Sequence, residues 1–308
     1  MSKKHILVVG SSNTDMIIKM ARLPRPGETV LGGDFLTAAG GKGANQAVGA
    51  ARAGGRVTFL ARVGRDALGE QAVAGWAAEG IDVKYILRDP AKPSGVALIF
   101  VGENGQNSIA VASGANARLS PADVERAAPA FASAQVVVLQ LETPLATVLA
   151  AAAAARRAGV PVILNPAPAQ RLSARLLRLV TILTPNETEA EYLTGVRVNS
   201  VASAARAAAE LRRRGARTVI VTLGARGALL VDDQGVRAVS GYKVKALDTT
   251  AAGDIFNGAL AVALAEQKPI PSAVEFANAA AALSVTRLGA QPSAPRRREI
   301  DRWLAQTS

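Results

Sequence analysis

Short apolar runs alternate along this chain with longer stretches whose apolar residues recur at helical spacing. The short runs are typical of buried strands in a parallel sheet, and the longer stretches are typical of helices packed on one face. The predicted strands are residues 6–9, 57–61, 136–139, 160–164, 180–183 and 218–222. The predicted helices are residues 44–53, 68–78, 144–158, 187–193, 202–214, 251–265 and 270–283. This alternation predicts an α/β fold, with an open, mostly parallel sheet and helices on both faces.

Two segments, residues 15–37 and 93–112, interrupt the alternation. They contain the apolar runs Met16-Ile17-Ile18 and Gly95-Val96-Ala97-Leu98-Ile99-Phe100-Val101, which are better interpreted as antiparallel strands than as crossover helices. We expect residues 1–308 to form a single α/β domain, with a small β-sheet made by these two inserted segments. Because so small a sheet needs a partner to cover its apolar face, we also expect a homodimer.

The composition narrows the chemistry that the chain can perform. At 308 residues and 49% hydrophobic residues, it can bury a full α/β core. The absence of Cys excludes disulfides, thiolate metal sites and a Cys nucleophile, and it suits a reducing cytoplasm, where we expect the protein. The single histidine, His5, excludes Ser-His-Asp catalysis and His-rich zinc sites. Acid–base chemistry must therefore depend mainly on carboxylates, Lys or Tyr.

The net charge of +12 raises the question of a nucleic-acid partner. The Arg residues are scattered along predicted helices, and only 4% of residues are aromatic, so few side chains can stack on bases. We interpret the positive charge as solvated helix faces and expect no nucleic-acid partner. Neither a secretion signal nor an apolar stretch of membrane-spanning length is present, so we expect no membrane association.

The segment Asp248-Thr249-Thr250-Ala251-Ala252-Gly253-Asp254 leads from an apolar stretch into a predicted helix. The first N–H groups of a helix lack partners within the helix and favour negative charge, and small residues there let a phosphate approach. Asp254 is expected in the first turn, beside an anion hole at Ala251, Ala252 and Gly253. Phosphoryl transfer to an alcohol needs such a carboxylate, because the hydroxyl loses its proton as it attacks. Considered alone, Asp254 is interpreted equally well as an ordinary first-turn acid.

Several other motifs occur in a characteristic order. They are Pro26-Gly27-Glu28-Thr29-Val30, Gly40-Gly41-Lys42-Gly43-Ala44-Asn45-Gln46-Ala47, Asn165-Pro166-Ala167-Pro168, Thr184-Pro185-Asn186-Glu187-Thr188-Glu189-Ala190-Glu191, Thr222-Leu223-Gly224-Ala225-Arg226-Gly227 and Gly289-Ala290-Gln291-Pro292-Ser293. With the Asp254 segment, this order resembles the ribokinase-like, or phosphofructokinase-B type, carbohydrate kinases. The resemblance extends from about His5 to Trp303, and it is greater to ribokinases than to nucleoside or fructose-phosphate kinases.

The resemblance implies a sugar site beneath a lid. In the family, the two inserted segments form this lid, which often pairs with a second subunit. The residues implied to bind the sugar, together with Asp254, are Asn13, Asp15, Gly41, Lys42, Gly43, Ala44, Asn45 and Glu142. Ligands of open α/β sheets bind beyond the carboxyl ends of the strands, where these motifs are expected. Asn13 has an alternative interpretation as a turn residue.

The resemblance also implies a nucleotide site for ATP. Its residues are Asn186, Glu189, Thr222, Leu223, Gly224, Ala225, Arg226, Gly227, Gly253 and Asn278. Glu189 resembles the family's acidic position that orders Mg²⁺ and phosphate through water, and it is equally well interpreted as a first-turn acid. Asn278 departs from the family pattern, because some ribokinases carry His beside the adenine at this position.

A monovalent cation, K⁺, is a further implication of the resemblance. Asp248 and Thr250 match one loop of the family's cation site, and Ser284, Arg287, Gly289 and Ser293 match the other, mostly through backbone oxygens. Thr250 replaces a residue that is often aliphatic, a change that leaves a backbone ligand intact. The alternative is that these residues only form turns.

The implied reaction is transfer of the ATP γ-phosphoryl group to the 5-hydroxyl of D-ribose, with Asp254 as general base and Mg²⁺ bridging the phosphates. Two alternative activities remain open, namely phosphorylation of 2-deoxyribose or of a nucleoside. The hydrogen-bonding side chains expected around the sugar favour a small polyhydroxylated substrate. A non-catalytic sugar or nucleotide sensor is the alternative from another class. The presence of Asp254 counts against it, because a sensor needs no base.

Overall fold

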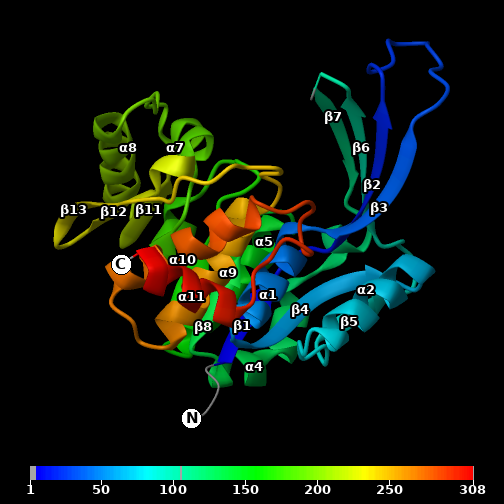
Figure 1. Ribbon diagram of the computed structural model, residues 1–308. Coiled ribbons are helices and arrows are strands. Elements are labelled where there is room, and N and C mark those ends of the chain that lie inside the picture. The colour runs from blue at the N-terminus through cyan, green and yellow to red at the C-terminus, as the bar shows by residue number, and fades with distance from the viewer. Residues whose placement is uncertain (1–4, 105, 308) are drawn as a thin grey trace.

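The computed structural model describes residues 5–104 and 106–307, and its largest element is a nine-stranded sheet (Figure 1). The strand order is β13-β12-β11-β10-β9-β8-β1-β4-β5. From β5 to β11 every pairing is parallel, whereas β12 and β13 are antiparallel. The bounds are β1 (His5–Val9), β4 (Arg56–Gly64), β5 (Ile86–Asp89), β8 (Val136–Leu139), β9 (Val162–Leu164), β10 (Ile182–Leu183), β11 (Thr218–Thr222), β12 (Ala228–Asp232) and β13 (Gly235–Val239).

Helices cover both faces of this sheet, because successive side chains of a strand point to opposite sides. In β1, Leu7 and Val9 join the core beneath α3, α4, α5, α7 and α8, while Ile6 and Val8 join the core beneath α1, α2, α9, α10 and α11. The helices are α1 (Lys42–Arg52), α2 (Ala67–Ala78), α3 (Pro121–Arg126), α4 (Ala128–Ser133), α5 (Leu145–Arg157), α6 (Ala174–Leu177), α7 (Glu187–Thr194), α8 (Val201–Arg213), α9 (Ala252–Ala265), α10 (Ile270–Ser284) and α11 (Arg297–Thr307). No helix among the described residues is both long and apolar enough to cross a membrane.

The predicted α/β fold is confirmed, and each predicted strand and helix is present; β8 and β11 have the predicted ends, and the others are shifted by one to three residues at one or both ends. β9 begins only at Val162, since Pro161 has no N–H for a strand ladder. The elements that were not predicted are β5, β12, β13, α3, α4, α6 and α11. Most of these elements are too short to show a clear apolar period in the sequence. The strand β13 shows none because it is largely exposed.

The two inserted segments form a separate four-stranded sheet in the order β3-β2-β6-β7, which projects from the main body (Figure 1). Its strands are β2 (Asn13–Met20), β3 (Asp34–Gly40), β6 (Gly95–Gly102) and β7 (Asn107–Ala112). The expectation of antiparallel strands is correct for β2 with β3 and for β6 with β7, but wrong for the central pair, because β2 and β6 are parallel. Both central strands start at the main body, with Asn13 opposite Gly95, and so they run outward together.

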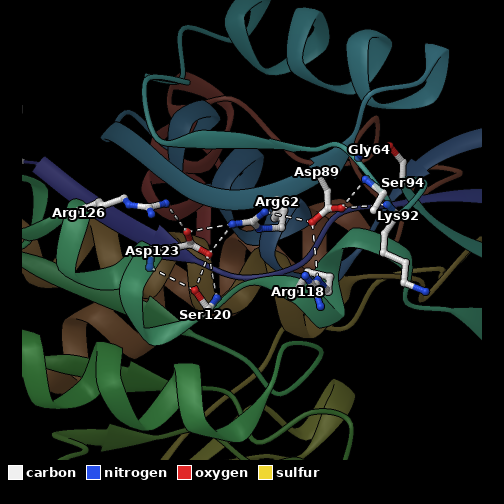
Figure 2. Close-up of polar contacts among 10 residues, drawn as sticks. Arg62, Gly64, Asp89, Lys92, Ser94, Arg118, Ser120, Asp123 and Arg126 are labelled. Carbon is white, nitrogen blue, oxygen red and sulfur yellow. Dashed lines mark hydrogen bonds and ion pairs between the residues drawn. The ribbon is translucent and has the colours of Figure 1, made fainter.

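A buried charge network fixes the base of the second hairpin (Figure 2). The Arg62 guanidinium of β4 bridges Asp89 at the end of β5, at 3.0 Å, and Asp123 of α3, at 2.8 Å. Ser94, just before β6, accepts a hydrogen bond from the Gly64 N–H at 3.0 Å. Because a buried carboxylate without its partner is costly, these contacts tie the chain entering β6 to the main sheet.

Candidate active site

Close packing of α1 against α9 brings the predicted base to its partners. A Cβ atom on Gly258 would lie 2.7 Å from both the Ala50 nitrogen and the Gln46 oxygen, so only glycine allows the two helices this close. The Asp254 carboxylate is 5% exposed and accepts hydrogen bonds from Asn45 Nδ2 and from Gln46 Nε2, each at 3.0 Å. The structure thus joins the glycine-rich segment before α1 to the Asp254 segment.

Burial and hydrogen bonding act in opposite directions on Asp254. Burial raises the pKa of its carboxyl group, whereas the Lys42 ammonium and the amides of Asn45 and Gln46 lower it, and burial prevails. For Lys42, burial lowers the pKa of the amine, but the surrounding carboxylates outweigh this effect and raise it. The predicted base is therefore a desolvated carboxylate beside a cation, an arrangement suited to proton abstraction.

The turn before α9 presents unpaired backbone N–H groups. Ala251 has a φ of 59°, in the left-handed region that few non-glycine residues adopt, and the helix begins at the next residue. Within the described chain, the N–H groups of Ala251, Gly253 and Asp254 donate to no acceptor, while that of Ala252 donates to the Thr249 carbonyl at 3.3 Å. Of the predicted anion hole, Ala251 and Gly253 thus keep their N–H groups available for an anion.

Two connected cavities lie beside this turn. A polar cavity of about 160 Å³ is bordered by Lys42, Glu189, Gly253 and Asp254. A larger cavity of about 410 Å³ shares five lining residues with it, namely Asn186, Thr222, Thr249, Ala252 and Gly253. The Asp254 carboxylate therefore borders the polar cavity, and the larger cavity lies directly beside it.

Most of the predicted nucleotide-binding residues border the larger cavity: Asn186, Thr222, Gly224, Ala225, Gly227, Gly253 and Asn278. Leu223 is buried and does not line it, and Arg226 instead pairs with Glu187 at 2.5 Å. Asn278 donates to the carbonyls of Val239 and Ser240, which tethers the irregular segment after β13. This segment, not predicted to contribute, adds Gly241, Tyr242, Val244 and Ala246 to the lining.

Glu189 fits both of its sequence interpretations. Its carboxylate accepts from the Asn186 N–H at 2.9 Å and Asn186 Oδ1 accepts from the Glu189 N–H at 2.8 Å, a capping box that begins α7. The same carboxylate borders the polar cavity. Burial raises its pKa, against the opposing effects of the Asn186 N–H and Lys42. Glu189 is thus a helix cap that also directs negative charge into the site.

The predicted sugar-binding residues lie at the base of the second sheet. Glu142 accepts from Ser11 Oγ at 2.6 Å and from the Lys42 N–H at 2.9 Å, and Asn13 Oδ1 accepts from Asn116 Nδ2 at 2.9 Å. Asn13 and Glu142 line a third cavity of about 510 Å³. Ser11 and Asn116 were not predicted, although Ser11 directly precedes the polar residues after β1.

The glycine-rich start of α1 contributes mainly backbone. Gly41, with a φ of 86°, precedes the first residue of the helix, and the N–H groups of Gly43 and Ala44 donate to Ser11 Oγ and to the Ser11 carbonyl at 3.3 and 2.9 Å. Asp15 lies in β2, where burial, followed by the charges of Glu142 and Asp254, raises the pKa of its carboxyl group to about 6. The carboxylates of Glu142 and Asp254 therefore lie close enough to Asp15 to affect its titration.

The two loops predicted to hold a monovalent cation are joined by Asp248. Its carboxylate accepts from the Thr250 N–H at 2.9 Å and from the Gly289 N–H at 2.8 Å. The hydroxyls of Ser284 and Ser293 donate to nearby carbonyls, and Arg287 pairs with Glu299 at 2.5 Å. The described residues offer no hydrogen bond to the carbonyls of Thr250, Arg287 and Gly289, nor do they contain a cluster of three or more His, Cys, Asp or Glu side chains suited to a metal. Available backbone oxygens fit a weakly held monovalent cation better than a divalent one.

Comparisons with known proteins agree with this geometry. The model of the pfkB family carbohydrate kinases matches residues 3–297. A protein of Haemophilus influenzae named ribokinase is 46% identical over 302 residues, 98% of this chain and 99% of that protein. A deoxyribokinase of Salmonella typhi is 39% identical over 302 residues, 97% of this chain and 98% of its own. The structure of Arabidopsis thaliana ribokinase complexed with ribose and ATP matches with a TM-score of 0.92 and 35% identity, covering 99% of both chains.

The raised pKa of Asp15 predicts a pH-dependent cost to stability. With a folded pKa of about 6 against an ordinary 3.8, the folded chain binds the proton more tightly, so stability falls as pH rises from about 4 to 6. We expect Asp15→Asn to raise the free energy of unfolding by about 3 kcal/mol at pH 7.5, and by only about 0.5 kcal/mol at pH 4. Urea denaturation at both pH values measures this difference. Asp34→Asn, exposed at the start of β3, is the control, and an equal effect of Asp15→Asn at both pH values would contradict the prediction.

Proposed function

The chain belongs to the pfkB family of carbohydrate kinases, and from this premise we propose that it transfers the γ-phosphoryl group of ATP to the 5-hydroxyl of D-ribose. The products are D-ribose 5-phosphate and ADP. The observation that carries the proposal is the buried Asp254 carboxylate, which lies beside the unpaired N–H groups that begin α9 and at the end of the connected cavities. The ribokinase and the ribose–ATP complex found among the similar proteins support the same substrates. The proposal includes a cytoplasmic location, which cell fractionation tests.

Asp254 is the general base of the proposed reaction. Its carboxylate takes the proton of the ribose 5-hydroxyl while that oxygen attacks the γ-phosphorus, and the bond to the ADP oxygen breaks. The N–H groups of Ala251 and Gly253, at the start of α9, stabilise the charge on the phosphoryl group in transfer. The Lys42 ammonium, in the same polar cavity, adds positive charge on the side of the base. Binding in the polar cavity brings the hydroxyl and the phosphate together.

We include Mg²⁺ as part of the nucleotide substrate. Glu189 and Asn186 border the polar cavity next to the anion hole, and a carboxylate oxygen is a suitable partner for hydrated Mg²⁺. When bound, Mg²⁺ neutralises charge on the ATP phosphates. The part of Glu189 is to orient the metal-bound water, while its hydrogen bond from the Asn186 N–H keeps the carboxylate in place.

The second sheet is proposed to be a lid and a dimer interface on a single α/β domain, with the inserted segments 15–37 and 93–112 as its parts. Asp15 stands on one of its faces, and the register puts Ile17, Leu36, Ile99 and Ile109 in a row on that same face. Leu36 and Ile109 are 47% and 55% exposed, which is unusual for an apolar row. A second copy of this chain would cover the row, and closure over the sugar would exclude water from the phosphoryl group.

Two other substrates are alternatives to ribose in the proposed reaction. The similarity to a deoxyribokinase supports 2-deoxyribose as one alternative substrate. A nucleoside is the second alternative. The polar side chains predicted to bind the sugar, including Asn13, Asp15, Asn45 and Glu142, favour a sugar with its full set of hydroxyls, because buried groups that lose a partner penalise analogues lacking one. A non-catalytic sensor is disfavoured, since it has no use for a desolvated base beside an anion hole.

Replacing the base tests the reaction directly. We expect Asp254→Asn to lower ribose-dependent ADP formation by about 10² to 10⁴-fold, because the variant cannot accept the proton. ADP release from Mg-ATP is measured with D-ribose, 2-deoxyribose, adenosine and fructose 6-phosphate, with and without EDTA. Asp233→Asn, in the exposed turn between β12 and β13, is the control. Calorimetric binding of ribose without turnover by the unaltered protein would favour the sensor instead.

The cation loops predict activation by K⁺. We expect faster turnover in K⁺ than in Na⁺, and we expect Asp248→Asn to require about tenfold more K⁺, since it loses a charge-assisted hydrogen bond that joins the loops. The measurement is initial rate against K⁺ concentration at constant ionic strength. Equal rates in the two salts, for the unaltered protein, would remove the cation from the proposal.

The apolar row predicts a dimer that a single charge disrupts. We expect the unaltered protein to be a dimer at micromolar concentration and Ile109→Lys to be a monomer, because burying an unpaired ammonium is costly. Sedimentation velocity measures both masses. Phe35→Lys lies on the opposite face of the same sheet by register and should remain dimeric. A monomeric unaltered protein would show that another partner, or none, covers the row.

A further inference from the structure

A row of buried polar side chains follows the carboxyl edge of the main sheet. Gln140, Asn165 and Thr184 directly follow β8, β9 and β10, which are neighbours in the sheet, and they are 1%, 6% and 1% exposed. Gln46 of α1 and Asn257 of α9 extend this row from the helix side. Polar groups buried this deeply are expensive unless they are hydrogen-bonded, so their pairing defines their geometry.

Gln46 is the centre of the row. Its Nε2 donates to Asp254 Oδ1 at 3.0 Å and to Asn165 Oδ1 at 3.2 Å, and its Oε1 accepts from Gln140 Nε2 at 2.6 Å. A glutamine amide has two N–H donors at one end and one oxygen at the other, so a single orientation satisfies all three contacts, and the flipped orientation would face oxygen against oxygen. Gln46 is fully buried and lines none of the three cavities, so it acts on Asp254 and not on a ligand.

Further hydrogen bonds lead from Asn165 to the turn that begins α9. Asn165 Nδ2 donates to the Thr184 carbonyl at 3.3 Å, and Thr184 Oγ1 donates to Asn257 Oδ1 at 2.7 Å. Asn257 Nδ2 then donates to the Gly253 carbonyl at 2.7 Å. The base and the turn that carries the anion hole are therefore the two ends of one buried network.

We propose that Gln46 is a positioning residue whose network with Asn165, Thr184 and Asn257 holds the Asp254 carboxylate and the anion hole at Gly253 in one geometry. The inference rests on the proposed kinase function. Each link is buried, so a displaced base would leave polar groups unpaired in the core, which penalises other positions of the carboxylate. Charges that also act on Asp254 come from four other elements, namely Lys42 of α1, Asp15 of β2, Glu142 after β8 and Glu189 of α7. Among the described residues, the side chains that donate hydrogen bonds to the Asp254 carboxylate are Asn45 and Gln46, so these four charged groups act on Asp254 only through their charge.

Gln46→Met removes the amide and keeps the length of the side chain. We expect kcat to fall by about 10 to 100-fold while KM for ribose and ATP changes little, since Gln46 does not touch either cavity. The lost N–H favoured the ionised carboxylate, so the acid limb of the kcat profile should move up by about one pH unit. A lower kcat without this movement would overturn the positioning role, as would an unchanged kcat and profile.

Thr184 offers a matched pair of variants at the far end of the network. Thr184→Val keeps the shape of the side chain and removes the hydroxyl, leaving Asn257 Oδ1 without its donor, whereas Thr184→Ser retains the hydroxyl. We expect kcat to be about tenfold lower in Thr184→Val and close to the unaltered value in Thr184→Ser. Equal losses in the two variants would show that packing, not the hydrogen bond, matters here.

A readout without turnover separates this inference from the proposed function. The carboxyl ¹³C signal of Asp254, followed by NMR against pH in the unliganded protein, reports its titration in the unaltered chain and in Gln46→Met. An upward displacement in the variant supports the positioning role, and identical titration curves overturn it. If the unaltered protein does not phosphorylate ribose, the proposed function fails, while this titration still decides the role of Gln46. Thermal unfolding of each variant identifies losses due to misfolding.

Discussion

The proposed reaction needs the Asp254 carboxylate to be buried and still able to accept a proton, and the rest of the structure has to meet both conditions. Burial alone would raise the pKa of Asp254 and hold it protonated, so the fold has to supply compensating donors in the core. Asn45 and Gln46 supply two amides, and Lys42 supplies a charge. These donors reach Asp254 only because Gly258 lets α1 and α9 approach closely. Core packing and catalytic chemistry thus depend on one helix contact.

In the proposed function, the order of strands assigns the two substrates to different parts of the sheet edge. The loops after β10 and β11 border the larger cavity, whereas the start of β2 carries Asn13 and the loop after β8 carries Glu142. The start of α9 lies between them and borders both connected cavities. Parallel strands place all these loops on one edge, so residues from distant parts of the chain converge without any long excursion of the backbone.

The second sheet combines a fixed base with exposed strands. Arg62 and its two buried carboxylates hold the start of the second hairpin, and Asn116 ties Asn13 at the start of the first. Further out, β7 is exposed along its whole length. The base of this sheet carries Asp15 and Asn13, so whatever covers the outer strands acts next to two of the predicted sugar-binding residues. The proposed assembly and the proposed substrate binding are thereby physically adjacent.

Local patterns in the sequence were enough to predict the main elements and their approximate chemistry. Apolar periodicity located the main strands and helices, since burial on one or both faces imposes it, and the glycine-rich segments identified the turns around Lys42 and Asp254. The sequence patterns did not identify Gln46, Asn165, Thr184 and Asn257 as members of one hydrogen-bond network with Asp254, although three of these residues lie inside the recognised motifs. Periodicity reports which face is buried, but not which buried polar groups meet. Three-dimensional packing alone shows that β2 and β6 run parallel, that α1 packs against α9 and that the Asp254 carboxylate accepts hydrogen bonds from two side-chain amides. The reason is that these contacts join residues more than two hundred positions apart or strands of separate hairpins, and local patterns carry no information on such pairings.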